Sequence, residues 1–178
     1  MSKVFISPSN QYFNRYYDNN GNEGLYMNLL SDVMVPYFLL NGIETARRDK
    51  NSTVAEAISE SNIFRPDLHI ALHSNASPDE SAGQNTGPEI YYFTESKDGK
   101  AAAEAIADEI AKIYPNPDNV KVIPVRNELA ELSRTTAPSV YVEVAYHDNP
   151  DDSEWIVNNL DAIGRAIVRG TINYLDNQ

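Results

Sequence analysis

Short apolar segments with the two-residue period of β-strands alternate along this chain with longer segments of helical period. The strand-like segments are residues 3–7, 43–47, 68–73, 89–93 and 139–145, with shorter extended pieces at 120–125 and 129–133. The helical segments are residues 24–41, 54–62, 100–114 and 151–176, the last with a break near Asn158 and Asn159. This alternation predicts one α/β domain over residues 1–178, with a twisted, mainly parallel sheet and helices on both faces.

Composition excludes several classes of partner. The net charge of -12 argues against nucleic acid and against a basic patch on anionic lipid, because both need clustered Lys and Arg. No apolar run is long enough for a membrane span, and the N-terminus enters a strand directly. We therefore expect a monomer that is made in the cytoplasm without a signal peptide and has no membrane partner. The chain has no cysteine, so any zinc must rest on His and carboxylate ligands.

His73 lies where the central strand gives way to a polar turn, just before Asn75. Ligand sites in open α/β sheets form outside the carboxyl ends of strands, so this histidine is a candidate ligand. A lone histidine is more often structural, which is the alternative interpretation. His69 projects to the same side but stands about 13 Å away by strand rise, so the two imidazoles are not expected to share an ion.

The first helix is expected to bury Leu25, Leu29, Val33 and Phe38. Pro36 lies in its interior, where we expect a kink or a broken turn.

Glu23 stands at the start of that helix, near the end of a loop over residues 9–24 that has no apolar periodicity. A loop of this length in a compact domain is usually functional or disordered, and its four aromatic side chains argue against disorder. They could form a groove wall or simply pack. An acid in the first turn also stabilises the helix dipole, so Glu23 alone indicates little.

Glu143 is the sharpest anomaly, because it interrupts a run of valines on the strand over residues 139–145. A carboxylate on a buried strand costs several kcal/mol unless it is paired, binds a metal or faces a cleft. Such a group is a functional-site candidate. The alternative is a structural salt bridge to Arg126 or Arg134.

Taken in order, these motifs resemble a known family. They are Ser-Pro-Ser-Asn-Gln after the first strand, Glu23 before a helix, His-Ser-Asn-Ala from residue 73, and Thr-Ala-Pro-Ser-Val-Tyr-Val-Glu-Val-Ala-Tyr-His-Asp-Asn from residue 136. The whole chain is similar to the zinc-dependent N-acetylmuramoyl-L-alanine amidases, which hydrolyse peptidoglycan. The resemblance implies that zinc is the cofactor, that Glu23 and His73 bind it, and that Glu143 is the catalytic base.

The same resemblance places substrate contacts around the cleft. Gly87-Pro88-Glu89 is similar to the family's Gly-x-Glu before a strand, which puts Glu89 near the substrate. Asn75, in the turn after His73, and His147, just past the strand of Glu143, are further candidates for substrate binding.

One position departs from the family pattern. The family's first ligand is a histidine in a Pro-Gly-His-Gly turn, whereas this chain reads Pro8-Ser9-Asn10-Gln11. An ungapped match places Asn10 at the histidine, but we favour Gln11 as the substitute. An amide oxygen is a poor zinc donor beside imidazole or carboxylate. Three alternatives stay open: a weaker amide site, nitrogen from His147 or His69, or loss of the metal.

The predicted function is hydrolysis of the amide between N-acetylmuramic acid and L-alanine, with Glu143 as general base. The partner is then peptidoglycan, reached after the protein is released from the cell. Two alternatives compete with this prediction. One is a degenerate homologue that binds cell-wall fragments without cutting them, and the other is a structural acidic α/β protein.

Overall fold

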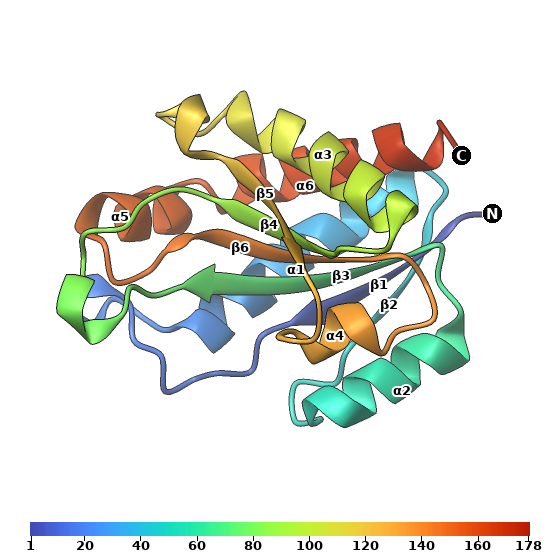
Figure 1. Ribbon diagram of the computed structural model, residues 1–178, viewed down its shortest axis with the longest axis horizontal. Coiled ribbons are helices and arrows are strands. Elements are labelled where there is room, and N and C mark those ends of the chain that lie inside the picture. The colour runs from blue at the N-terminus through green and yellow to red at the C-terminus, as the bar shows by residue number, and fades with distance from the viewer.

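Six strands form one sheet in the order β2-β1-β3-β6-β4-β5 (Figure 1). The computed structural model describes all residues, 1–178. The strands are β1 (Lys3–Pro8), β2 (Glu44–Arg47), β3 (Leu68–Asn75), β4 (Glu89–Phe93), β5 (Lys121–Val125) and β6 (Ser139–Tyr146). The α-helices are α1 (Glu23–Leu40), α2 (Val54–Phe64), α3 (Lys97–Ala111), α4 (Ala130–Ser133), α5 (Pro150–Asn158) and α6 (Leu160–Leu175).

Strand directions confirm a mainly parallel sheet. β1 runs parallel to both β2 and β3, and β3 runs parallel to β6. β4 and β5 run parallel to each other, but β4 runs antiparallel to its other neighbour, β6. The carboxyl ends of β1, β3 and β6 therefore meet at one edge of the sheet, at the left of Figure 1.

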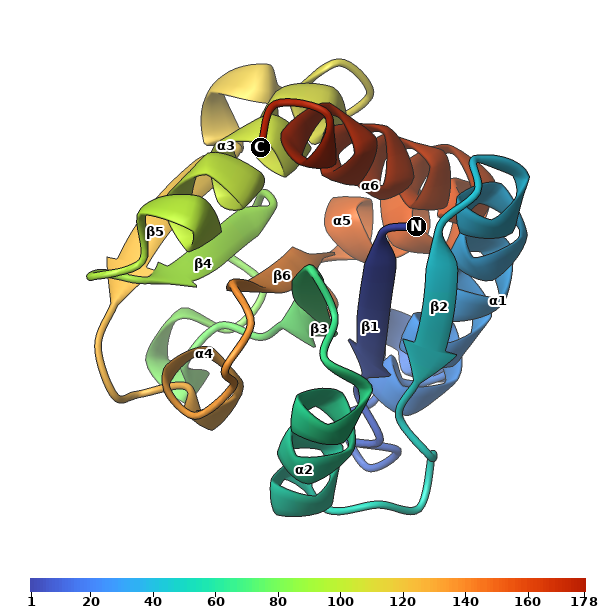
Figure 2. The ribbon, with the colours of Figure 1, turned by 90° about the vertical axis from the view of Figure 1, so that its right-hand side faces the viewer.

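Helices cover both faces, as the alternation predicts. Figure 2 shows α1, α3 and α6 over one face and the shorter α2 and α4 over the other. The apolar members of β3 (Leu68, Ile70 and Leu72) join the main core on the α1–α6 side. Because side chains alternate across a strand, His69 and His73 project to the opposite face, toward α2 and α4. The face of the sheet toward α2 and α4 therefore carries buried polar side chains, among them His69 and Glu131.

The first helix corrects two expectations. Phe38 is fully buried as predicted and Val33 is half-buried. Leu25 and Leu29, however, are 42% and 40% exposed. Met27, Leu30 and Met34 are fully buried instead, so the buried stripe is rotated over the first half of the helix. The helix also runs unbroken through Pro36. Pro36 is exposed, so water can satisfy the carbonyl that its missing N–H leaves free.

The segment 129–133 is not extended, which is a third correction. Residues 130–133 form the single helical turn α4, which turns Glu131 and Leu132 inward. The predicted break in the last helical region is confirmed, since α5 ends at Asn158 and α6 begins at Leu160.

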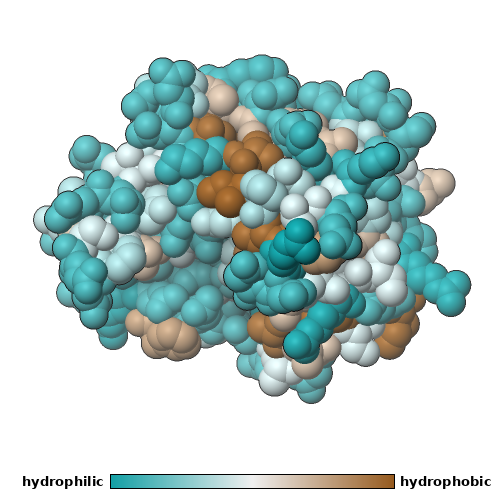
Figure 3. Space-filling view, viewed as in Figure 1, coloured by the Kyte–Doolittle hydropathy of each residue, from teal (hydrophilic) through white to brown (hydrophobic).

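The hydrophilic surface (Figure 3) agrees with the large number of charged residues in the sequence. Figure 3 shows a largely hydrophilic face, with apolar atoms gathered along the edge strand β5, where Val122, Ile123 and Val125 are half-buried. None of the helices combines the length and the apolar character that crossing a membrane requires.

Candidate active site

Three side chains that the sequence singled out come together at the carboxyl edge of the sheet. His73 lies near the end of β3 and is the register partner of Glu143 on β6. Glu23 is the first residue of α1, directly after the N-cap Asn22. The loop that leads into α1 brings Glu23 onto His73, with 2.8 Å between Glu23 Oε1 and His73 Nδ1. The Tyr141 ring stacks on the His73 ring with centroids 4.2 Å apart and limits its rotation.

Amide groups from the first loop complete a polar network around Glu23. Gln11 Nε2 lies 3.4 Å from Glu23 Oε1 and 3.4 Å from His73 Nδ1. Asn14 Nδ2 donates to Glu23 Oε2 at 2.6 Å and to Gln11 Oε1 at 3.2 Å. Asn14 thus fixes which end of the Gln11 amide faces the histidine. No sequence pattern indicates a role for Asn14, because it lies in a loop without periodicity.

Of the two amides left open as the first ligand, only that of Gln11 faces Glu23 and His73. The Asn10 amide instead donates to the carbonyl of Ser52 at 2.9 Å.

The distances between the polar atoms of Glu23, His73 and Gln11 can be compared with the donor–donor distances of a metal site. Glu23 Oε1, His73 Nδ1 and the Gln11 amide form a triangle with edges of 2.8, 3.4 and 3.4 Å. Donors of a tetrahedral zinc site with bonds of about 2.0–2.1 Å stand about 3.3–3.4 Å apart. No three His, Asp or Glu side chains are placed to hold a metal by themselves. A metal held by Glu23 and His73 would take its third donor from the Gln11 amide only with the amide oxygen turned inward and its contact with Asn14 rearranged.

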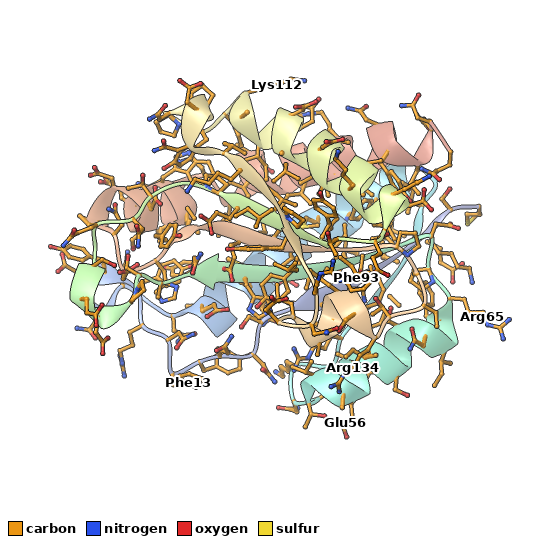
Figure 4. The ribbon with its side chains drawn as sticks, in the orientation of Figure 1. Phe13, Glu56, Arg65, Phe93, Lys112 and Arg134 are labelled. Atoms are coloured by element: carbon orange, nitrogen blue, oxygen red, sulfur yellow. The ribbon has the colours of Figure 1, made fainter.

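Glu143 has no ion-pair partner. Its Oε2 is shut off from solvent and makes no hydrogen bond. Arg126 pairs with Glu95 instead, and Arg134 lies over α2, where its carbonyl accepts from Asn62 (Figure 4). The structural salt bridge considered for Glu143 is therefore absent.

The electrostatics of the site favour a cation. The pKa of Glu143 is raised to about 8, chiefly by burial; His73 lowers it, and the carboxylates of Glu23 and Glu89 raise it. Burial lowers the pKa of His73, but Glu23, Glu143 and Glu131 together raise it above its ordinary value. A divalent ion at Glu23 and His73 would offset this negative charge and favour ionised Glu143. The residues present therefore fit a cation held by one carboxylate, one imidazole and one amide oxygen.

Glu89 lies beside Glu143 as its antiparallel register partner. Its Oε2 accepts hydrogen bonds from Asn75 Nδ2 at 3.1 Å and from the Tyr91 hydroxyl at 2.5 Å. Its Oε1 forms an ion pair with Lys121 at 3.2 Å. Two of the predicted substrate contacts, Glu89 and Asn75, are thus hydrogen-bonded to each other next to the predicted base.

His147, the third predicted substrate contact, is buried behind the first loop. Its Nδ1 lies 3.0 Å from Ser74 Oγ and 2.8 Å from the Ser74 carbonyl. Its ring stacks on Tyr16 with centroids 5.3 Å apart. Its ring and its carbonyl, which accepts from the Tyr17 N–H at 2.8 Å, support the loop, whereas Nδ1 contacts Ser74 and not Glu23 or His73.

The aromatic side chains of the first loop divide into two groups. Tyr16 is buried against Tyr26 and His147. Tyr12 and Tyr17 are about half exposed, and Phe13 is 77% exposed and points outward from the loop (Figure 4). Packing therefore accounts for Tyr16, while the other three remain available at the surface.

The sequence profile of the N-acetylmuramoyl-L-alanine amidase family matches residues 30–173, and the chain belongs to this family of peptidoglycan amidases. The match includes His73 and Glu143. It leaves out residues 1–29, which contain Gln11 and Glu23. No curated protein sequence matches this chain.

Solved structures show the same fold. An N-acetylmuramoyl-L-alanine amidase from Clostridium difficile 630 is similar with a TM-score of 0.87 and 19% identity, over 99% of this chain and 98% of that chain. The catalytic domain of CwlV, an N-acetylmuramoyl-L-alanine amidase from Bacillus (Paenibacillus) polymyxa var. colistinus, has a TM-score of 0.83 and 16% identity over 100% of both chains. The catalytic domain of the CD27L endolysin, which targets Clostridia difficile, has a TM-score of 0.75 and 24% identity, over 97% of this chain and 98% of that chain.

Proposed function

We propose that this chain hydrolyses the amide between N-acetylmuramic acid and L-alanine in peptidoglycan. The observation that carries the proposal is the unpartnered Glu143 carboxylate beside the Glu23–His73 pair, in a chain that belongs to an amidase family. An unpaired carboxylate at this position is costly for stability, and proton transfer during catalysis gives it a role.

Zinc is the cofactor in this proposal, held by Glu23, His73 and the amide oxygen of Gln11. When bound there, it would supply polarisation of the scissile carbonyl and acidification of a water molecule. Gln11 is a weaker donor than imidazole, so we expect zinc to bind less tightly than at a site with two histidines.

Glu143 acts as general base and then as general acid. Its carboxylate takes a proton from the attacking water, whose oxygen forms the new bond to the lactyl carbonyl carbon. The C–N bond then breaks, and Glu143 returns the proton to the departing amine of L-alanine. The products are the lactyl carboxylate and a free stem peptide.

Glu89 and Asn75 line the substrate side of Glu143 in this mechanism, and His147 contributes through the loop that it supports. We propose that the protein acts as a monomer on the cell wall after release. The lack of clustered basic charge agrees with a partner other than nucleic acid.

The test uses purified peptidoglycan, with the new amino groups of L-alanine labelled after digestion. Wild type is expected to release them, and Glu143→Gln to release them about 10²- to 10⁴-fold more slowly because proton transfer is lost. Glu95→Gln is the matched control, since Glu95 lies in an exposed ion pair and should leave the rate unchanged. A Glu143→Gln rate equal to wild type would contradict the proposed base.

A binding module is the second candidate, and the Asn14–Gln11 pair favours it. As oriented, these amides saturate Glu23 with hydrogen bonds and turn nitrogen, not oxygen, toward His73. If wild type sediments with peptidoglycan but releases no amino groups, the protein binds wall fragments without cutting them.

A further inference from the structure

A lysine lies beside the candidate active site and has no role in the mechanism above. Lys121 is the first residue of β5, and its Nζ forms an ion pair with Glu89 Oε1 at 3.2 Å. Lys121 is the register partner of Glu89, which is in turn the register partner of Glu143. Register partners share a face of the sheet. The three side chains therefore stand in one row across β6, β4 and β5, which Figure 2 shows side by side.

The ammonium group of Lys121 can bind a second anion. The Glu89 carboxylate is buried, and its other oxygen accepts hydrogen bonds from Asn75 and Tyr91. The Lys121 side chain is 54% exposed, and an ammonium group has three N–H donors, of which Glu89 takes one. Two donors of Lys121 are thus left for a ligand above the buried carboxylate.

Lys121 is also the only lysine or arginine that forms an ion pair with a carboxylate of this site. Glu23 and Glu131 pair with histidines, and Glu143 has no ion-pair partner. Arg126 follows the far end of β5 and stands about 17 Å from Lys121 by strand rise. An acidic group of the substrate that binds level with Glu143 therefore meets Lys121 and not Arg126.

The spacing of the row matches the length of the stem peptide. Neighbouring strands lie about 4.8 Å apart, so Lys121 stands about 10 Å from Glu143. In the proposed reaction Glu143 returns a proton to the amine of L-alanine, which places that nitrogen about 3 Å from its carboxylate. The next residue of the stem is D-glutamate, whose α-carboxyl group lies two residues from this nitrogen, at most about 7 Å away. A stem peptide that crosses β4 thus brings this carboxyl group to Lys121.

We propose that Lys121 binds the α-carboxylate of the second stem residue and so selects stems in which this group is a free acid over stems in which it is an amide. The inference rests on the proposed function for the position of the scissile bond, but binding can be measured without cleavage. Lys121 contacts the substrate away from the reacting atoms, so its role is in specificity.

The first experiment measures the binding of two ligands that differ only at this group, N-acetylmuramoyl-L-alanyl-D-glutamate and N-acetylmuramoyl-L-alanyl-D-isoglutamine. The Glu143→Gln variant is used so that neither is cleaved, and calorimetry gives both dissociation constants. The acid should bind about 3- to 10-fold more tightly, the range between an exposed ion pair and a charged hydrogen bond. Adding Lys121→Gln should abolish this preference, and Lys121→Arg should retain it. Equal affinities with Lys121 present, or binding of neither ligand, would overturn the proposal.

Lys112→Gln is the matched control. Lys112 is another exposed lysine that pairs with a buried glutamate, Glu109, but it follows the end of α3 on the other side of the sheet. This variant should keep the preference for the acid. If Lys121 serves only to neutralise Glu89, Lys121→Gln will weaken the binding of both ligands equally, which also contradicts the proposal.

Hydrolysis of the same two compounds by wild type separates this inference from the proposed function. If both are cut, kcat/KM should favour the acid by the same factor, through KM and not through kcat. If wild type binds the acid more tightly but cuts neither compound, the amidase function fails while the role of Lys121 stands.

Discussion

Gln11 provides an amide where an imidazole would make a stronger metal ligand. Its side chain reaches both Glu23 and His73, and Asn14 holds it from behind. The proposed metal site therefore depends on one residue whose donor strength is low. Changing that donor should change metal affinity without disturbing the rest of the site.

Gln11→His is expected to raise zinc affinity about tenfold or more, because imidazole nitrogen binds zinc better than an amide oxygen. A tenfold change needs only about 1.4 kcal/mol of extra binding free energy. Competition with a chromophoric chelator measures it directly.

Asn10→His is the matched control for Gln11→His. The Asn10 side chain is bonded to the Ser52 carbonyl and faces away from Glu23, so this variant should bind zinc as wild type does. A gain in Asn10→His with none in Gln11→His would mean that the ungapped alignment is right and that Gln11 is not a ligand.

At the scale of elements, the strand ends and the turns that precede them determine where the side chains of the site lie. β4 begins just after Gly87, whose φ of 102° few side chains tolerate. A Cβ added there would meet the Asn119 carbonyl oxygen at 2.4 Å. The turn thus admits only glycine, and it fixes where Glu89 enters the sheet.

Gly87→Ala is expected to lower the free energy of unfolding more than Gly42→Ala does. Gly42 also has a positive φ, of 71°, but an added Cβ meets nothing within 4 Å, so its variant bears only the backbone cost of about 1–2 kcal/mol. The clash at Gly87 should add about 1 kcal/mol or more. Urea unfolding measures the free energy of unfolding of both variants. An equal decrease in the two would show that the backbone of the turn at Gly87 moves to relieve the clash.

Sequence patterns predicted the elements with strong periodicity and missed the weak ones. β3 and β6 alternate clearly, so His73 and Glu143 could each be singled out on their strands, but that the two strands pair and bring them together is seen only in the structure. Glu131 could not be singled out, because a four-residue helix has no readable period and its burial depends on contacts with β6 and α2. The rotated face of α1 was missed because Met27 and Met34 gave no stronger apolar signal than Leu25 and Leu29.

At the scale of the whole molecule, the chain combines a family-typical body with a divergent first segment. The family profile covers residues 30–173, while Gln11 and Glu23 precede it. The body supplies His73 and Glu143, and the first segment supplies Gln11 and Glu23, the other two donors of the proposed metal site. In the proposed function, the choice between cutting peptidoglycan and only binding it therefore depends on residues 9–24.

The most direct test is the release of new L-alanine amino groups from purified peptidoglycan by protein stripped of metal, before and after one equivalent of zinc is added back. We predict no release by the stripped protein and recovery of hydrolysis once zinc is added back. Full activity without metal would contradict the role of Glu23, His73 and Gln11. Bound zinc without hydrolysis would contradict the role of Glu143 and leave a wall-binding protein.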